Sequence, residues 1–233
     1  MIEPPGTAAA QTDWNAVGIF GGTFDPVHFG HLRTAFECQQ RLALPEIRFI
    51  PCGDPPHRVN PLASAAIRLR MLKEAVAPVE GFRVDTRELE RDGPSYTIDT
   101  LMSLREELPS TTLCLLLGFD AFAGFTGWRE WRSIFDFAHV IVARRPGAAA
   151  LADEILSELL VQRRAESPQE LRGKSSGLIF LADVTQLEIS SSNLRASLAN
   201  GLPPTYLMPK SVEEIVLNVR CYGPQKPESE RTL

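Results

Sequence analysis

Short apolar runs alternate with amphipathic segments along most of the chain. The runs at 113–117 and 140–143 contain only Leu, Ile, Val, Ala and Cys, which is typical of strands buried on both faces of a parallel sheet. The pattern predicts strands at 16–21, 47–51, 82–85, 112–118, 139–144 and 178–182, and helices at 31–43, 66–77, 97–108, 129–136, 149–163, 192–199 and 210–220. We therefore expect an α/β fold that is Rossmann-like and doubly wound, with a mainly parallel sheet and helices on both faces.

The two ends of the chain lack this alternation. Residues 1–13 are rich in Pro, Ala, Gly and Thr, and residues 224–233 are polar and contain two prolines. We expect both to be flexible extensions of a single domain at 14–223. Within that domain, the polar segment 164–177 is predicted to be a loop. Its Gly173-Lys174-Ser175 resembles the end of a P-loop, but Pro168 stands in the place of the first glycine and no strand precedes it.

Composition narrows the class of protein. The chain has 233 residues, 44% of them hydrophobic, and a net charge of −5 without a basic block. A sizeable core can form, and binding to nucleic acid is disfavoured because it requires a cationic surface. The longest apolar run is too short to cross a membrane. Four widely spaced cysteines and the lack of a secretory signal pattern suggest free thiols in the cytoplasm. A homo-oligomer is compatible with the sequence, which does not specify one.

The motif with the clearest chemistry joins the first predicted strand to the first predicted helix. Residues 21–31 read GGTFDPVHFGH, so glycines, a hydroxyl and two imidazoles are expected between a strand end and a helix start. Glycine lets the backbone approach a ligand closely because it has no Cβ. A helix start offers unpaired N–H groups and a partial positive charge. This combination is typical of a nucleotide phosphate site in an α/β protein.

The two histidines of this motif have other interpretations. His28 and His31 have nearly the spacing of a zinc-binding pair, but zinc needs a third or fourth ligand. The remaining histidines, His57 and His139, have no matching motif around them. A purely structural role is the other alternative. We favour phosphate binding, because Pro26 and Gly30 indicate that His28 lies in the loop and only His31 in the helix.

A second candidate phosphate site lies near the C-terminus. Residues 189–195 read ISSSNLR and lead directly into a predicted amphipathic helix. One serine can act as an ordinary N-cap. Three serines in a row and an arginine in the first turn need a further reason, since an arginine at a helix N-terminus opposes the helix dipole. Hydroxyls, backbone amides and a guanidinium together suit a polyphosphate.

The two motifs together resemble the paired signatures of the nucleotidylyltransferase α/β-phosphodiesterase superfamily. More closely, the chain resembles the bacterial nicotinate-nucleotide adenylyltransferases. Segments between the motifs agree with that family in a consistent order from about residue 16 to about residue 222: PPHR at 55–58, PSYT at 94–97, GFD at 118–120, WREW at 128–131 and HVIVARRPG at 139–147. The extension at 1–13 is longer than the catalytic core requires, and the region around Cys221 and the C-terminal tail carry no family signal.

The resemblance implies adenylyl transfer from ATP to nicotinate mononucleotide, giving deamido-NAD and pyrophosphate, with Mg²⁺ bound through the substrate phosphates and no metal-ligating residue of the protein. It implies catalytic roles for His28, His31 and Arg195. The implied ATP-binding residues are Gly21, Gly22, Thr23, Phe24, Gly118, Asp120, Ile189, Ser191 and Ser192. The implied residues for nicotinate mononucleotide are His57, Arg58, Tyr96, Thr97, Trp128 and Arg144.

Other interpretations of individual residues remain open at this point. Without the resemblance we would favour Trp128 as a core residue beside Trp131, and the alternative for Asp120 is a helix N-cap. Ser95 or Thr97 is suited to capping the helix predicted at 97–108. Arg144 and Arg145 are explained as a solvated surface pair, or one of them reaches the site. At the level of the whole protein, the alternatives are a sister transferase acting on phosphopantetheine or nicotinamide mononucleotide, a non-catalytic nucleotide sensor, and a zinc-dependent hydrolase.

Overall fold

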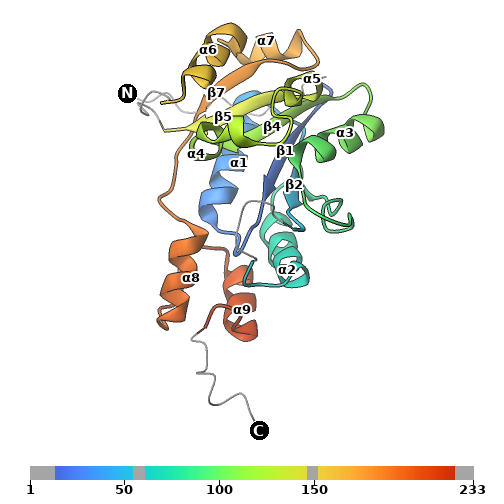
Figure 1. The fold of residues 1–233 in the computed structure, drawn as a ribbon. Coiled ribbons are helices and arrows are strands. Elements are labelled where there is room, and N and C mark those ends of the chain that lie inside the picture. The colour runs from blue at the N-terminus through green and yellow to red at the C-terminus, as the bar shows by residue number, and fades with distance from the viewer. Residues whose placement is uncertain (1–13, 55–60, 146–151, 224–233) are drawn as a thin grey trace.

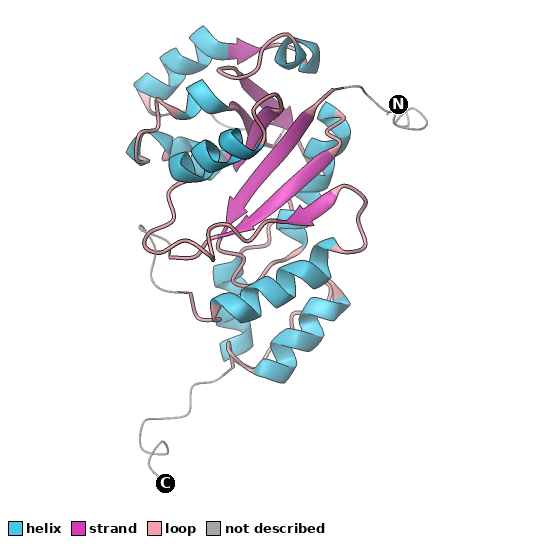
Figure 2. Cartoon of the chain, turned by 90° about the vertical axis from the view of Figure 1, so that its right-hand side faces the viewer, coloured by secondary structure: helices cyan, strands magenta, loops and turns pink. Residues whose placement is uncertain are grey.

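A seven-stranded parallel sheet forms the centre of the described part of the protein (Figures 1 and 2). The computed structural model describes residues 14–54, 61–145 and 152–223. The strands are β1 (Ala16–Gly22), β2 (Glu46–Pro51), β3 (Phe82–Val84), β4 (Thr112–Gly118), β5 (His139–Arg144), β6 (Arg164–Ala165) and β7 (Ile179–Asp183). Their order is β3-β2-β1-β4-β5-β7-β6, and every pairing is parallel. The predicted α/β fold with a parallel sheet is confirmed.

Helices cover both faces of this sheet. One core joins the sheet to α1 (Phe29–Leu42), α2 (Ala65–Val76), α7 (Pro168–Arg172), α8 (Ser191–Ala199) and α9 (Lys210–Val219). The other joins it to α3 (Thr97–Glu107), α4 (Phe119–Ala123), α5 (Ile134–Phe137), α6 (Glu154–Arg163) and a 3₁₀ turn, η1 (Phe125–Gly127). In β1, Val17 and Ile19 belong to the second core, and Ala16 and Phe20 belong to the first. This alternation is the pleat of a strand that is buried on both faces.

Two segments differ most from the sequence-based prediction. Of the helix predicted at 129–136, only residues 134–136 are helical, within α5. The preceding residues form turns, and Glu130 has a φ of 50°, which an α-helix does not allow. The loop predicted at 164–177 contains the short strand β6 and the helix α7. Both elements are too short to produce a periodic pattern in the sequence.

A buried histidine explains how the segment after α7 is held. The Nε2 atom of His139 lies 3.1 Å from the carbonyl oxygen of Leu171 and 3.0 Å from that of Lys174. The backbone N–H of Leu178 donates to its Nδ1 atom at 3.1 Å. This pattern assigns the ring proton to Nε2. The P-loop-like Gly173-Lys174-Ser175 is thus part of a turn fastened to β5, away from the cleft described below.

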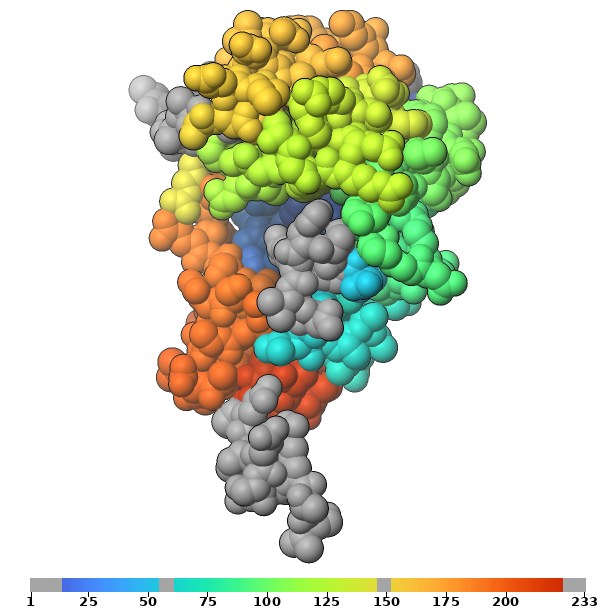
Figure 3. Space-filling model, viewed as in Figure 1, coloured from blue at the N-terminus to red at the C-terminus, as the bar shows by residue number. Residues whose placement is uncertain are grey.

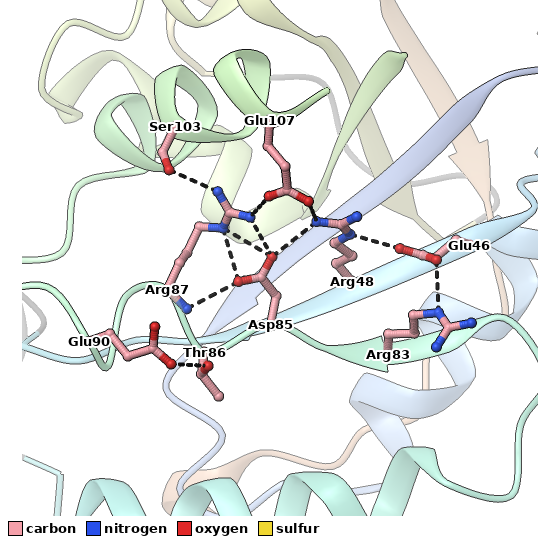
Figure 4. A network of polar contacts seen from close by, with 9 residues as sticks. All are labelled: Glu46, Arg48, Arg83, Asp85, Thr86, Arg87, Glu90, Ser103 and Glu107. Carbon is pink, nitrogen blue, oxygen red and sulfur yellow. Dashed lines mark hydrogen bonds and ion pairs between the residues drawn. The ribbon is translucent and has the colours of Figure 1, made fainter. Parts of the chain in front are cut away.

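Arginines and carboxylates pair along the β2–β3 edge of the sheet (Figure 4). Arg48 contacts Glu46 at 2.7 Å, Glu107 at 2.8 Å and Asp85 at 3.4 Å. Arg87 contacts Asp85 at 2.8 Å and also pairs with Glu107. Burial acts to raise the pKa of Asp85, but hydrogen bonds from Arg87 outweigh it and hold that pKa below its usual value. This network ties β2 and β3 to the C-terminal end of α3.

The sequence-based expectations on termini and membranes meet the structure only in part. Residues 1–13 and 224–233 lie outside the described residues. Within the described part of the chain, no helix combines the length and the apolar character needed to cross a bilayer. All four cysteines are free thiols.

Candidate active site

A cleft of about 1360 Å³ opens at the C-terminal ends of β1 and β4. Figure 3 shows the hollow in the middle of the molecule, with the blue N-terminal region at its floor, the yellow-green segment above it and the orange segment beside it. Strands β1 and β4 are neighbours, whereas β2 lies on the other side of β1. The strand order therefore reverses at this point, which is where open α/β sheets bind their ligands.

The loop after β1 is held in place by an aromatic cluster. Phe24 has a φ of 49° and is only 1% exposed. Its ring lies 6.0 Å from the rings of Phe20 and Phe49 and 5.2 Å from that of His31, measured between centroids. A left-handed conformation is unfavourable for a bulky residue, so this packing is what keeps the turn in shape. The turn brings the backbone of Gly22 and Thr23 to the cleft.

The two histidines of the motif stack on each other at the start of α1. Their ring centroids are 3.8 Å apart, and His28 is the N-cap residue of the helix without capping it through its side chain. The Nδ1 atom of His28 is buried and has no hydrogen-bond partner within the described structure. Burial lowers the pKa of His28 to about 4, so the ring is neutral near pH 7. An unpartnered polar atom in a binding cleft is typical of a functional site.

Gly30 is required for this arrangement. A Cβ atom at that position would lie 2.9 Å from the ring of His28 and 3.2 Å from the carbonyl oxygen of Ile189. Carbon atoms do not approach that closely without a shift of the neighbouring groups. The glycine thus lets the start of α1 lie close to both the His28 ring and the backbone before α8.

The second motif contacts the first directly. Ser190 caps α8, because its Oγ accepts a hydrogen bond from the N–H of Asn193 at 3.2 Å. Ser191 donates through Oγ to the carbonyl oxygen of Pro26 at 3.0 Å. Arg195 donates to the carbonyl oxygen of Asp25 at 2.7 Å and to Oγ of Ser192 at 3.2 Å. These bonds join segments that are more than 160 residues apart in sequence.

Aromatic side chains that pack against the second core also line the cleft. Trp128 is half-buried, with its ring 5.4 Å from that of Phe125, whereas Trp131 is buried in the core. Tyr96 is the N-cap residue of α3, has no capping side-chain bond and carries the guanidinium of Arg129 at 4.7 Å from its ring centroid. The core interpretation therefore suits Trp131 better than Trp128, which lines the cleft.

The capping interpretations of nearby residues are not supported. Ser95 accepts a hydrogen bond from the N–H of Gly53 at 3.1 Å and does not cap α3. Gly118 is the N-cap residue of α4, and Asp120 lies exposed in the first turn of that helix, without a capping bond. The carboxylate of Asp120 is therefore available at the cleft wall.

Most residues implied by the resemblance come together in this cleft. Its lining includes Gly21, Gly22, Thr23, Phe24, His28, His31, Tyr96, Thr97, Gly118, Asp120, Trp128, Ile189, Ser191, Ser192 and Arg195. Arg144 is not in the lining, because it pairs with Asp183, its register partner on β7, at 2.8 Å. Its neighbour Arg145 lines the cleft instead and pairs with Glu188 at 2.7 Å. His57 and Arg58 lie outside the described residues.

The sequence interpretation missed several buried polar residues around the cleft. Arg68 is 1% exposed and donates to the carbonyl oxygen of Thr23 at 2.8 Å. Its position on the same helix face as Met71 and Leu72 was the available signal, since an arginine on an apolar helix face needs a partner. Glu88 is 8% exposed and accepts a hydrogen bond from Thr100 at 2.6 Å. Burial raises its pKa, and nothing in the local sequence indicated this.

Metal binding by the histidine pair gains no support from the geometry. In the part of the chain that the structure describes, no three His, Cys, Asp or Glu residues gather in a way that could hold a metal ion. The stacked rings of His28 and His31 lie parallel within 30°, rather than converging on a common point as the ligands of a tetrahedral zinc do.

Comparisons with known proteins place the chain in a family. A family model described as cytidylyltransferase-like matches residues 19–197. The chain is 45% identical over 208 residues to a protein of Methylococcus capsulatus named "Probable nicotinate-nucleotide adenylyltransferase", covering 89% of this chain and 99% of that protein. It is also 45% identical to a protein of the same name from Aeromonas hydrophila, covering 96% of this chain and 100% of that protein.

A solved structure is similar in fold. It is described as Plasmodium falciparum nicotinic acid mononucleotide adenylyltransferase complexed with APC, and it has a TM-score of 0.67 and 18% sequence identity. The match covers 89% of this chain and 97% of that chain.

Proposed function

The chain belongs to the cytidylyltransferase-like family and, within it, to the nicotinate-nucleotide adenylyltransferases, and we propose that its cleft joins ATP to nicotinate mononucleotide in NAD biosynthesis. The products are deamido-NAD and pyrophosphate. The observation that carries the proposal is that the starts of α1 and α8 lie side by side. Ser191 and Arg195 of α8 donate hydrogen bonds to the loop between β1 and α1. Two such helix starts facing one cleft suit a polyphosphate.

The chemistry requires positioning and charge neutralisation rather than a general base. A phosphate oxygen of nicotinate mononucleotide attacks the α-phosphorus of ATP, and the bond from that phosphorus to the oxygen bridging to the β-phosphorus breaks. The nucleophile is already anionic near pH 7, so no proton has to be removed. Rate acceleration then comes from orientation of the two substrates and from donors aimed at the developing charge.

The ATP phosphates are assigned to the two helix starts. His28 and His31 contact the α-phosphate and the departing pyrophosphate, and Arg195 holds the β- and γ-phosphates. Because burial lowers the pKa of His28, this ring acts as a neutral N–H donor. A neutral ring also avoids placing two positive charges in a stack with centroids 3.8 Å apart.

The remaining ATP contacts follow the cleft wall. The backbone of residues 21–24 lies where both substrates meet, and the hydroxyls of Ser191 and Ser192 add donors near the phosphates. Asp120, exposed at the start of α4, accepts hydrogen bonds from the adenosine ribose, with Gly118 leaving room for it. Ile189 packs against the nucleoside.

The pyridine nucleotide is assigned to the aromatic end of the cleft. Trp128 stacks on the pyridine ring, and the uncapped N–H groups at the start of α3, near Tyr96 and Thr97, face its carboxylate. This assignment favours the acid over the amide, because a carboxylate accepts hydrogen bonds only. His57 and Arg58 are proposed for the phosphate. Arg145, which lines the cleft, takes the part expected of Arg144.

Mg²⁺ is proposed to bind through the substrate phosphates. The cleft residues fit this arrangement: the phosphate end offers N–H, hydroxyl and guanidinium donors, and the Asp25 carboxylate there is occupied by backbone N–H groups. Mg²⁺ commonly keeps several waters and needs few protein ligands when phosphates are present. When bound, the ion neutralises phosphate charge and stabilises the pyrophosphate leaving group.

The cellular setting is proposed to be the reducing cytoplasm, which suits the four free thiols. Burial raises the pKa of Cys38 to about 12, and it also raises the pKa of Cys114 above its usual range. These thiols are therefore unreactive core residues. A homo-oligomer remains compatible with this proposal.

Pyrophosphate release tests the proposal. The protein is supplied with ATP and Mg²⁺ and with either nicotinate mononucleotide or nicotinamide mononucleotide. We expect strong preference for the acid. Turnover with the amide alone would keep the chemistry and overturn the assignment of the Tyr96–Trp128 end. Release with neither, followed by release with phosphopantetheine, would identify the sister transferase instead.

A further inference from the structure

Tyr222, near the C-terminus, reaches the first motif of the chain. It follows the end of α9 and is 2% exposed. Its hydroxyl donates to Oδ1 of Asp25 at 2.5 Å. Burial and the neighbouring Asp25 carboxylate both raise the pKa of Tyr222 above its usual range, so the hydroxyl remains a donor at any pH the protein experiences. Asp25 itself is 3% exposed and belongs to the loop between β1 and α1.

Asp25 joins four segments of the chain at one point. Its Oδ2 atom accepts from the N–H of Leu62 at 2.9 Å, and its Oδ1 atom accepts from the N–H of Ala63 at 3.1 Å. Its backbone carbonyl accepts from Arg195 at 2.7 Å. The orientation of Asp25 therefore fixes the position of two parts of the cleft. One is the Arg195 guanidinium, which is assigned to the ATP phosphates, and the other is the cleft wall at Leu62.

Tyr222 reaches Asp25 from outside the cleft. It is not in the cleft lining, whereas Asp25, Leu62 and Arg195 are. Charge-assisted hydrogen bonds of this kind are short and strong. A buried carboxylate that loses one of these bonds rotates toward its remaining donors, or its remaining hydrogen bonds become weaker. Rotation about the Asp25 backbone would displace the carbonyl that Arg195 contacts.

We propose that Tyr222 is a positioning residue for adenylyl transfer, which fixes Asp25 and through it the Arg195 guanidinium and the cleft wall at 62–63. The inference rests on the proposed function of the cleft. It assigns a role at the phosphate end to a residue that lies 27 positions beyond the second motif. Among the described residues, the bonds of this relay join Asp25 to Leu62, Ala63, Arg195 and Tyr222, and none of these bonds goes to Tyr96, Thr97 or Trp128.

The first test is the Tyr222→Phe variant, which keeps the ring and removes only the hydroxyl. We expect kcat/KM for ATP to fall about tenfold, since about 1.4 kcal/mol of transition-state stabilisation corresponds to that factor. KM for nicotinate mononucleotide should change less than about twofold on the same scale. A role limited to packing would move neither parameter.

Val216→Ala is the matched control. Val216 lies in the same apolar cluster as Tyr222, is 2% exposed and is not in the cleft lining. The Val216→Ala variant should lower the melting temperature at least as much as Tyr222→Phe does, and it should leave kcat/KM for ATP unchanged. If both variants lowered kcat/KM equally, general destabilisation would explain the effect and the relay would be rejected.

Asp25→Asn provides a second route should Tyr222→Phe fold poorly. It keeps the size of the side chain and weakens the same relay from its other end. We expect it to reproduce the fall in kcat/KM for ATP, and we expect the double variant to be no worse than Asp25→Asn alone. Additive losses in the double variant would show that the two residues act independently and would overturn the inference.

Calorimetric titration with a non-hydrolysable ATP analogue separates this inference from the proposed function. Analogue binding does not depend on the second substrate. We expect the wild type to bind and Tyr222→Phe to bind several-fold more weakly. Equal affinity together with equal turnover would overturn the relay. A wild type that binds the analogue but never releases pyrophosphate with nicotinate mononucleotide would overturn the proposed function and leave the relay tested by affinity alone.

Discussion

At the β2–β3 edge of the sheet, three arginines and three carboxylates pair with one another, and each carboxylate contacts two arginines (Figure 4). At the β1–β4 cleft, by contrast, the Asp25 carboxylate beside Arg195 is 3.9 Å away, and the shortest bond of that arginine is to a backbone carbonyl oxygen. Arg195 and Arg68 donate to carbonyl oxygens, and the Nδ1 atom of His28 has no hydrogen-bond partner within the described structure.

The difference between the two regions separates residues that stabilise the fold from residues that can bind a ligand. Where each charge already has an opposite charge beside it, a further anion gains little. The close bonds of Arg195 go to a carbonyl oxygen and a serine hydroxyl, and its ion pair with Asp25 is long, so its guanidinium can still attract phosphate. Two buried histidines show the same contrast: both ring nitrogens of His139 are bonded to the backbone, whereas His28 keeps an unpartnered nitrogen beside the cleft. The region in which polar groups lack hydrogen-bond partners is therefore the one suited to a ligand.

The sharpest way to test this comparison is to remove a group at the cleft. His31→Ala should lower kcat/KM by about 100- to 1,000-fold, the usual effect of deleting a donor to transition-state charge, while the melting temperature stays close to that of the wild type. Steady-state kinetics and thermal denaturation measure the two quantities. Near-normal turnover would remove the phosphate-binding role of the histidine pair.

Acidification should lower the stability of the folded protein because the His28 ring is buried. The unfolded chain takes up a proton at His28 near pH 6.5, whereas the folded protein does so only near pH 4. The free energy of unfolding therefore falls as the pH falls through this window, by about 3 kcal/mol. Denaturant unfolding at several pH values measures this slope.

His28→Asn is the control for that slope, because it removes the titrating group. The variant should lose most of the pH dependence between 6.5 and 4. His139 contributes in the same direction, since burial lowers its pKa too, and its share should remain in the variant. Identical slopes in variant and wild type would show that His28 is not the group responsible.

The aromatic end of the cleft can be separated from the phosphate end. Trp128→Ala should raise KM for nicotinate mononucleotide about tenfold, in line with the loss of a stacking contact, and should change KM for ATP much less. Initial rates with each substrate varied in turn distinguish the two effects. Equal increases in both KM values would return Trp128 to the role of a core residue.

A substitution in the arginine–carboxylate network should have the opposite pattern, with a loss of stability and no loss of activity. It is also the smallest effect that we expect. Arg48→Met should lower the free energy of unfolding by about 1 kcal/mol and leave kcat/KM unchanged, because each carboxylate that Arg48 contacts keeps a second arginine. Urea unfolding and initial rates test this together. A marked loss of activity would mean that the network is coupled to the cleft.

The local sequence determined the order of elements and the chemistry at their ends. Apolar runs at 113–117 and 140–143 predicted β4 and β5 because strand burial depends on side chains within a few residues. The motif at 21–31 predicted a ligand site at a strand end and helix start, and the structure has β1 and α1 in those places. Prediction was weakest for 129–133 and 164–172, where short turns and helices have no period to detect.

Only the tertiary structure decided which distant groups meet. Arg195 bonds to the carbonyl of Asp25, and Tyr222 bonds to its carboxylate. The register of β5 with β7 directs Arg144 to Asp183, which leaves Arg145 to line the cleft. The physical reason is that many of these partners are backbone carbonyls and N–H groups, which every residue carries. The sequence shows the donor, and the fold alone shows which acceptor lies opposite it.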